Sequence, residues 1–297
     1  NQNYIFQHIG RLRLFIRQIS VFDNPLGRAL CCLFLNRNKC KSFAGLMMGQ
    51  VKKILVTGGA SGIGAAICRR MSDRNSHFLL HTRANQAGLE KTIRDIERNG
   101  GRANAEFADL AVKGAARSLV QRAKELLGGL DVLVANAGYA LKTPITDVSD
   151  EDFEKAHATI SRSFFELATA AIPLLEKSDF GRIIGISAFG PHVWRTNVTP
   201  FPATAAAKAS MEVTAKALAL QLGPSGITVN LIAPGFVKKD QDAHAAISPE
   251  TLKKLVDQIP IGRVAEPEEI AAVVAFCASN EASYITGQVI HVNGGLV

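Results

Sequence analysis

Apolar runs of strand length alternate with segments of helical period from Lys52 to the end of the chain. This alternation is typical of βαβ units and of a parallel sheet. The run Lys53–Thr57 has no polar face, which predicts a fully buried strand. The strands that we expect, in chain order, cover residues 53–57, 77–82, 102–107, 131–135, 182–187, 227–232 and 288–292.

Helical segments separate these strands, and two of them end at the glycine pairs Gly100-Gly101 and Gly128-Gly129. A single large α/β sheet can reach roughly 250 residues, so most of the 297 residues fit in one domain. We therefore predict one doubly wound parallel sheet with helices on both faces. The expected helices cover residues 65–74, 87–98, 112–127, about 150–176, 204–222, 249–258 and 267–279.

Positive charge is concentrated in residues 1–47, which contain seven Lys or Arg and one acidic residue. This segment therefore carries six of the eight net positive charges of the chain, and a nucleic-acid-binding face on the rest is not expected. Its longest apolar stretch, residues 29–35, is too short for a membrane span. We expect residues 1–47 to be a basic head outside the folded domain, which would comprise residues 48–297.

Cysteine usage indicates a reducing compartment. Cys31, Cys32 and Cys40 lie in the head, whereas Cys68 and Cys277 fall on apolar helix faces, and the odd number has no disulfide-framework spacing. We predict a cytoplasmic protein, or one of an organelle matrix if the Arg-rich head is a transit peptide. No zinc, iron or calcium spacing occurs, so we predict no metal and no membrane contact.

A glycine-rich loop joins the first strand to the first helix. Gly58, Gly62 and Gly64 carry no side chains, so the pyrophosphate of a dinucleotide can approach backbone N–H groups at a helix N-terminus. Ser61 and Ile63 complete this loop, and Ala65-Ala66 begin the helix. Strand, loop and helix together predict a Rossmann-type dinucleotide site.

The end of the second strand indicates which dinucleotide binds. An acidic side chain there would accept the ribose 2′-hydroxyl of NAD, whereas an arginine would accommodate a 2′-phosphate. The sequence reads His81-Thr82-Arg83, without an acid. We predict NADP(H) rather than NAD(H), with Arg83 as the phosphate partner; the alternative is that Arg83 is an ordinary surface arginine.

Further motifs give the chain a resemblance to the short-chain dehydrogenase/reductase family over residues 52–297. Within that family, Ile259-Pro260-Ile261-Gly262-Arg263 and the following Glu266-Pro267-Glu268-Glu269-Ile270-Ala271 resemble the β-ketoacyl-carrier-protein reductase group. The motifs that carry the resemblance are Thr57-Gly58-x-x-x-Gly62-x-Gly64, Asp109-Leu110, Ala135-Asn136-Ala137-Gly138, Pro234-Gly235, Ile285-Thr286-Gly287-Gln288 and Asn293-Gly294-Gly295.

The resemblance implies positions around the cofactor and a class of reaction. Asp109, with Leu110 beside it, would contact the adenine, Asn136-Ala137-Gly138 would lie against the middle of the cofactor, and Pro234-Gly235 would border the nicotinamide. The reaction would reduce a small-molecule carbonyl, such as a 3-oxoacyl thioester. Family members usually form homo-oligomers, so a tetramer or dimer is expected.

Family chemistry also requires a tyrosine that donates a proton and a lysine four residues later. Hydride transfer to a carbonyl produces an alkoxide, and a nearby ammonium lowers the pKa of the tyrosine that protonates it. Lys208 matches the lysine, and it would also contact the cofactor. Thr204 stands where the tyrosine is expected, and an aliphatic hydroxyl is a far weaker acid than a phenol.

Other positions of the family's catalytic set are also altered. Ile160 stands where the long helix should carry an asparagine, and Lys239 stands where a threonine usually contacts the carboxamide. The serine position falls on Ala188 or on Ser187, depending on the residue from which it is counted, and Ser187 is the candidate.

Tyr139 is the candidate for a substitute proton donor, because it follows Gly138 at the carboxyl end of a strand. An ordinary surface or packing tyrosine is the alternative. His192, in a lengthened loop, and His157, on the long helix, are weaker candidates. Two functions follow: an NADPH-dependent reductase, or a catalytically impaired dinucleotide-binding subunit or scaffold.

Overall fold

Seven parallel strands form one sheet in the computed structural model, which describes residues 51–296 except 199, 239–252 and 255. The strand order is β3-β2-β1-β4-β5-β6-β7, so the chain changes direction across the sheet between β1 and β4. Ligands of such sheets bind at this switch point, beyond the carboxyl ends of the strands. The strands are β1 (Lys52–Thr57), β2 (Ser76–Thr82), β3 (Arg102–Phe107), β4 (Val132–Ala135), β5 (Arg182–Ile186), β6 (Thr228–Pro234) and β7 (Val289–Val292).

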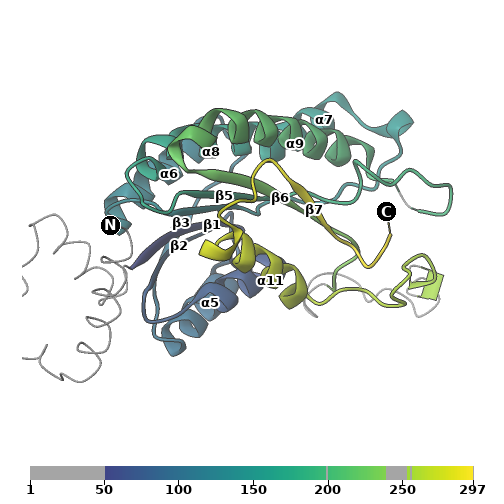
Figure 1. Ribbon diagram of the computed structural model, residues 1–297. Coiled ribbons are helices and arrows are strands. Elements are labelled where there is room, and N and C mark those ends of the chain that lie inside the picture. The colour runs from purple at the N-terminus through teal and green to yellow at the C-terminus, as the bar shows by residue number, and fades with distance from the viewer. Residues whose placement is uncertain (1–50, 199, 239–252, 255, 297) are drawn as a thin grey trace, which may run out of the picture. The chain divides into compact units, whose positions relative to one another are not determined.

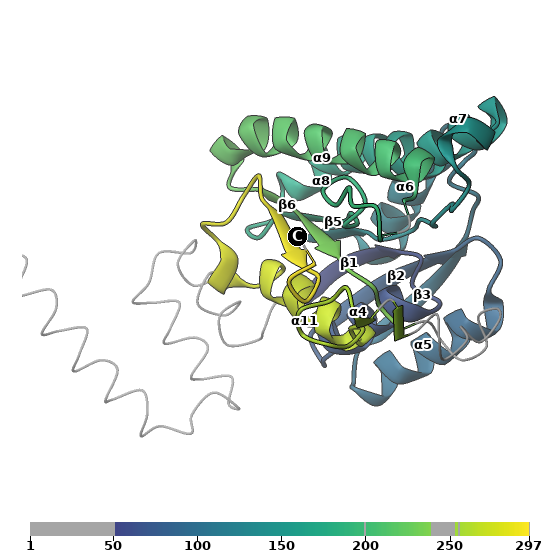
Figure 2. The same cartoon turned by 90° about the vertical axis from the view of Figure 1, so that its right-hand side faces the viewer.

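Helices cover both faces of the sheet (Figure 1). One layer contains α6 (Ala115–Leu127), α8 (Ser163–Leu175) and α9 (Pro202–Leu222), and α7 (Asp150–His157) leads into it. The other layer contains α4 (Gly62–Met71), α5 (Gln86–Arg98) and α11 (Pro267–Cys277). The view turned by 90° in Figure 2 shows the sheet between the two layers.

Two apolar cores result from the alternation of side chains along the strands. Leu55 and Leu133 point into the core under α6, α8 and α9, whereas Ile54 and Val132 point into the core over α4, α5 and α11. The middle of β1 and all of β4 are buried on both faces, which explains the apolar runs at residues 54–56 and 132–135.

Cys68 and Cys277 are buried free cysteines in the core over α4, α5 and α11. Burial raises the pKa of Cys277 to about 11 and raises the pKa of Cys68 as well. Both side chains are therefore protonated packing residues near neutral pH.

The predicted fold class is confirmed, with corrections at the ends of several elements. The first helix begins at Gly62 and not at residue 65, because the glycine loop itself forms its first turn. The helix expected from residue 204 begins at Pro202, whose fixed φ suits a first helical position. Lys239, the head and half of the helix predicted at residues 249–258 (249–252 and 255) lie outside the described residues.

The long helix expected over residues 150–176 is divided by a wider turn. A π-helical segment, Ala158–Arg162, separates α7 from α8. Such turns contain one residue more than an α-helical turn, which local propensity does not signal. Within the described part of the chain, no helix combines the length and the apolar character needed to cross a bilayer.

A buried carboxylate on α8 caps α6 from outside. The residue before α6, Gly114, has no side chain for capping, and its N–H donates to both carboxylate oxygens of Glu166, at 3.2 and 3.0 Å. Glu166 is 5% exposed. A negative charge at a helix N-terminus is favourable, so this contact fixes α6 against α8.

We expect Glu166→Ala to lower the free energy of unfolding by about 1–3 kcal/mol, because it leaves the N–H of the half-buried Gly114 without its partner and removes a buried side chain. Glu166→Gln retains one acceptor oxygen and should lose less. Glu125→Ala, an exposed position on α6, is the matched control and should change stability by less than about 0.5 kcal/mol. Urea denaturation measures all three, and equal losses for Glu166→Ala and Glu125→Ala would contradict the capping role.

Candidate functional site

The glycine loop packs too closely for side chains at two of its positions. A Cβ on Gly64 would lie 2.0 Å from the carbonyl oxygen of Gly58, and one on Gly58 would lie 2.9 Å from the Asn136 amide nitrogen. Gly58 and Gly62 also have positive φ angles, +67° and +51°. The exposed Ser61 precedes α4, whose first turn contains Ile63 and Gly64. The loop thus has the open backbone that a pyrophosphate needs.

Asn136 holds the end of β4 against this loop. Its amide Nδ2 donates to the carbonyl oxygens of Thr57, at 2.9 Å, and Gly58, at 3.1 Å. In return, the buried Thr57 hydroxyl accepts from the backbone N–H groups of Asn136 and Ala137, each at 3.0 Å. The sequence shows Thr57 only as the first residue of the glycine motif, and its hydrogen bonds to the end of β4 were not predicted.

The residues predicted for the adenine end lie at the ends of β2 and β3. Arg83 is exposed in the turn between β2 and α5, and no ion pair within the described residues occupies its guanidinium group. Asp109 is exposed, and one carboxylate oxygen accepts from the N–H of Ala111 at 2.9 Å. Leu110 is buried in the core beside it.

A buried histidine connects these two strand ends. The Nε2 of His81 lies 2.9 Å from the carbonyl oxygen of Ala108, which fixes Nε2 as the donor. Burial lowers the pKa of His81, so its ring is neutral near pH 7. His81 therefore supports the strand end that precedes Arg83.

Lys208 lies buried beside Gly138, in the segment that follows β4. Its Nζ donates to the carbonyl oxygen of Ile186 at the end of β5, and a Cβ built on Gly138 would lie 3.3 Å from it. Burial lowers the pKa of Lys208 to about 8, and the negative charge of Glu212 opposes that shift. At neutral pH the lysine is therefore mostly cationic, next to the Asn136-Ala137-Gly138 segment.

Thr204 and Ile160 have structural environments. The Thr204 hydroxyl donates to the Phe201 carbonyl oxygen at 3.3 Å and accepts from the Leu141 N–H at 3.4 Å. It thereby ties the segment after β4 to the first turn of α9. Ile160 is 1% exposed in the π-helical turn, where it contributes only to the apolar core.

Ser187 is bonded to an acid that sequence inspection did not single out. Its hydroxyl donates to Oε1 of Glu212, a side chain 6% exposed on α9. The same oxygen lies 3.0 Å from Nε2 of His192. Glu212 stands four residues after Lys208, so the spacing placed both on one helix face, but nothing in the sequence indicated its partners.

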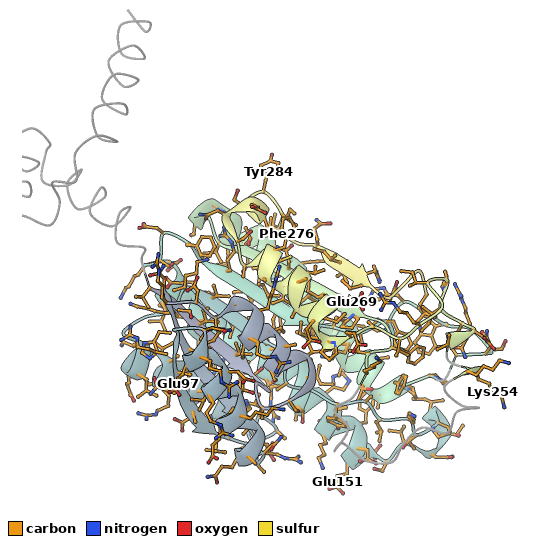
Figure 3. All side chains as sticks on the ribbon, turned by 90° about the horizontal axis from the view of Figure 1, so that it is seen from below. Glu97, Glu151, Lys254, Glu269, Phe276 and Tyr284 are labelled. Atoms are coloured by element: carbon orange, nitrogen blue, oxygen red, sulfur yellow. The ribbon has the colours of Figure 1, made fainter. Side chains whose placement is uncertain are left out.

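Tyr139 is half-exposed, at 38% of its surface. Partial burial and the negative charge of Asp152 raise its pKa, which makes the phenol a weaker acid. Tyr284 is fully exposed and projects away from the ribbon in Figure 3, and Tyr4 lies outside the described residues. His157 packs its ring on Phe153 with centroids 4.5 Å apart and faces the Ser161 hydroxyl.

Pro234 and Gly235, expected to border the nicotinamide, close the carboxyl end of β6. A Cβ on Gly235 would lie 2.8 Å from the Cα of Asn293, which explains the glycine. The carbonyl oxygen of Pro234 accepts from the N–H of Phe189, so this end of β6 is joined to the loop that follows β5.

In the described part of the chain, no group of three or more His, Cys, Asp or Glu side chains could hold a metal ion. Ser187, Glu212 and His192 form a hydrogen-bonded cluster.

A glycine loop at the switch point of a doubly wound parallel sheet defines a Rossmann-type dinucleotide-binding protein. The family model described as Enoyl-(Acyl carrier protein) reductase matches residues 58–297. The chain belongs to the short-chain dehydrogenase/reductase family, a family of oxidoreductases, as the motifs predicted.

Relatives in this family include reductases and dehydrogenases. The chain is 35% identical to the 3-oxoacyl-[acyl-carrier-protein] reductase FabG of Rickettsia conorii, over 83% of this chain and 97% of that protein. It is 32% identical to the 3beta-hydroxysteroid dehydrogenase 1 of Eggerthella lenta, over 82% and 93%. A short-chain dehydrogenase of Burkholderia cenocepacia, solved in complex with NADP, superposes with a TM-score of 0.76 at 30% identity, over 83% and 98%.

We expect Gly64→Ala to disrupt the loop, because the new Cβ would meet backbone oxygen and the Asn136 amide, neither of which can move freely. Overpacking of this kind costs about 1–3 kcal/mol of stability. NADPH affinity should fall at least about tenfold, since the loop itself shifts. Gly223→Ala, where a Cβ meets nothing within 4 Å, is the matched control. Fluorescence titration and thermal unfolding test this, and wild-type NADPH affinity in Gly64→Ala would contradict the role of the glycine loop in binding the cofactor.

Proposed function

We propose that this protein is an NADPH-dependent reductase of a carbonyl compound, with a 3-oxoacyl thioester as the substrate class. The observation that carries the proposal is the buried cationic Lys208 beside Gly138, at the cofactor loop. The open glycine loop fits a dinucleotide, and the FabG relative supports the substrate class. NADP(H) is favoured by Arg83 and by the NADP complex of the Burkholderia cenocepacia relative.

NADPH supplies a hydride to the carbonyl carbon when it is bound, and the protein must supply the accompanying proton. In this proposal Tyr139 donates that proton to the carbonyl oxygen, and the ammonium of Lys208, next to Gly138, stabilises the tyrosinate that results. Solvent returns the proton to the half-exposed phenol. Ser187 does not face the carbonyl directly, because its hydroxyl hydrogen bonds to Glu212.

The second candidate is a dinucleotide-binding subunit or scaffold without turnover. It is favoured by Thr204, whose hydroxyl is occupied by backbone partners, and by the aliphatic Ile160. The raised pKa of Tyr139 is in the same direction, since it weakens the substitute donor.

We also propose a homo-oligomer and a cytoplasmic location. The face of α8 and α9 exposes the apolar side chains Phe165, Val213 and Leu220, at 48%, 68% and 81% of their surfaces. A second copy of the chain would cover such a surface.

The reductase proposal is tested by NADPH oxidation with short 3-oxoacyl thioesters, ketones and quinones. We expect turnover of a 3-oxoacyl thioester, with Lys208→Ala and Tyr139→Phe each lowering kcat about 10²-fold or more, as for loss of a general acid or its partner. NADPH binding without turnover of any compound would contradict the reductase and favour the scaffold. Full activity of Tyr139→Phe would exclude Tyr139 as donor and leave the reductase in place.

Cofactor choice is tested at Arg83. We expect Arg83→Ala to raise the Kd for NADPH about 10- to 100-fold and to leave the Kd for NADH unchanged, because it removes a charge-assisted contact to the 2′-phosphate. Arg98→Ala, an exposed arginine on α5 paired with Asp95, is the control. Equal losses for both cofactors in isothermal titration would show that Arg83 does not select between them.

A further inference from the structure

A buried carboxylate joins three parts of the chain near the site. Glu212 on α9 accepts from Ser187 at the end of β5 and faces His192 in the following loop. The ring of His192 lies edge-on to that of His291 on β7, with centroids 4.6 Å apart. Buried acids are uncommon unless they are paired. The burial of Glu212 therefore indicates that its hydrogen bonds have a role in holding these elements together.

The hydrogen-bond roles in this cluster are fixed by chemistry. A carboxylate only accepts, so the Ser187 hydroxyl and His192 Nε2 must both donate to Oε1. His192 therefore carries its proton on Nε2, and the ring orientation is determined. His291 adds no hydrogen bond, and its pKa is lowered by burial and then by His192, whereas Glu212 acts in the opposite direction.

The loop held by Glu212 also has an apolar attachment. Phe189, Val193 and Val198 form a small separate core with Leu296, close to the chain's C-terminal end, and Phe236 packs on Phe189. Between these contacts Trp194 and Arg195 are exposed. The polar bonds to Glu212 fix the side of this loop that faces α9.

Glu212 also acts on the lysine one helical turn before it. Its negative charge opposes the loss of a proton from the buried Lys208, whose Nζ donates to the Ile186 carbonyl oxygen. The carboxylate itself is buried, with 6% of the Glu212 surface exposed. One side chain therefore serves both the loop and the lysine.

We propose that Glu212 is a positioning residue, which fixes the loop at residues 188–198 against α9 through Ser187 and His192 and places its carboxylate one helical turn from Lys208. The inference rests on the proposed function only in that Lys208 and the loop would act on cofactor and carbonyl. Neither effect requires Glu212 to touch substrate.

Two readouts that need no turnover test it. The pH dependence of Lys208 acylation by acetic anhydride, followed by mass spectrometry, reports the pKa of Lys208. Trypsin cleavage after Arg195 reports opening of the loop. In Glu212→Gln we expect the Lys208 titration to move down from about 8 by about one unit, because an opposing charge is lost. Cleavage after Arg195 should become at least about tenfold faster, because an anchoring contact weakens.

Matched variants separate the two effects. His192→Phe retains the carboxylate of Glu212 and removes the Nε2–H donor of the loop, so it should speed cleavage and leave the Lys208 titration unchanged. His291→Gln alters a neighbouring ring that does not bond to Glu212, so it should change neither readout. If Glu212→Gln fails to fold, Glu212→Asp, which keeps the charge on a shorter chain, should speed cleavage with a smaller titration shift.

A wild-type Lys208 titration or wild-type Arg195 cleavage in folded Glu212→Gln would overturn the proposal. If the protein turns over a carbonyl, the same variant should also raise KM and move the alkaline limb of kcat to lower pH. A chain that binds NADPH without turnover would end the reductase proposal, but both readouts at Glu212 would still apply.

Discussion

The amide group of Asn136 holds the end of β4 against the glycine loop, and the arrangement of the site depends on this contact. It uses the carbonyl oxygens of Thr57, the last residue of β1, and of Gly58, the first residue after it. Gly64 must lack a side chain because the amide and the Gly58 carbonyl occupy that space. The same contact sets the position of Gly138, and hence of the surface on which Lys208 rests.

The glycine loop, the end of β4 and Lys208 were largely predictable because the sequence features that indicate them are local. Buried strands, glycines at fixed offsets and a lysine on an Ala-rich helix are each visible within a few residues. The parallel, doubly wound sheet followed from the alternation of strands and helices, whereas the order of the strands was not predicted. The ends of elements were less predictable. The first turn of α4 lies inside the glycine loop, and α9 begins at Pro202, before the residue at which the apolar pattern predicts its start.

The polar contacts of the buried acids Glu166 and Glu212 were not predictable, because their partners are distant in sequence. Glu166 lies 52 residues from Gly114, and Glu212 lies 25 residues from Ser187. Nothing in local composition distinguishes these acids from solvated ones on the same helices. The π-helical turn at Ala158–Arg162 was missed for a related reason: its extra residue is set by packing against neighbouring helices and not by propensity.

The small core of Phe189, Val193, Val198 and Leu296 stands apart from the two large cores of the sheet. A change of volume there is absorbed by the loop and the chain end, and the packing between sheet and helices is left intact. Substitutions can therefore change the loop at residues 188–198 in small steps without loss of the folded sheet and helices. The sheet and the glycine loop can stay constant while the loop at residues 188–198, which has its own core, changes. Such a fold is well suited to act on a range of related reactants.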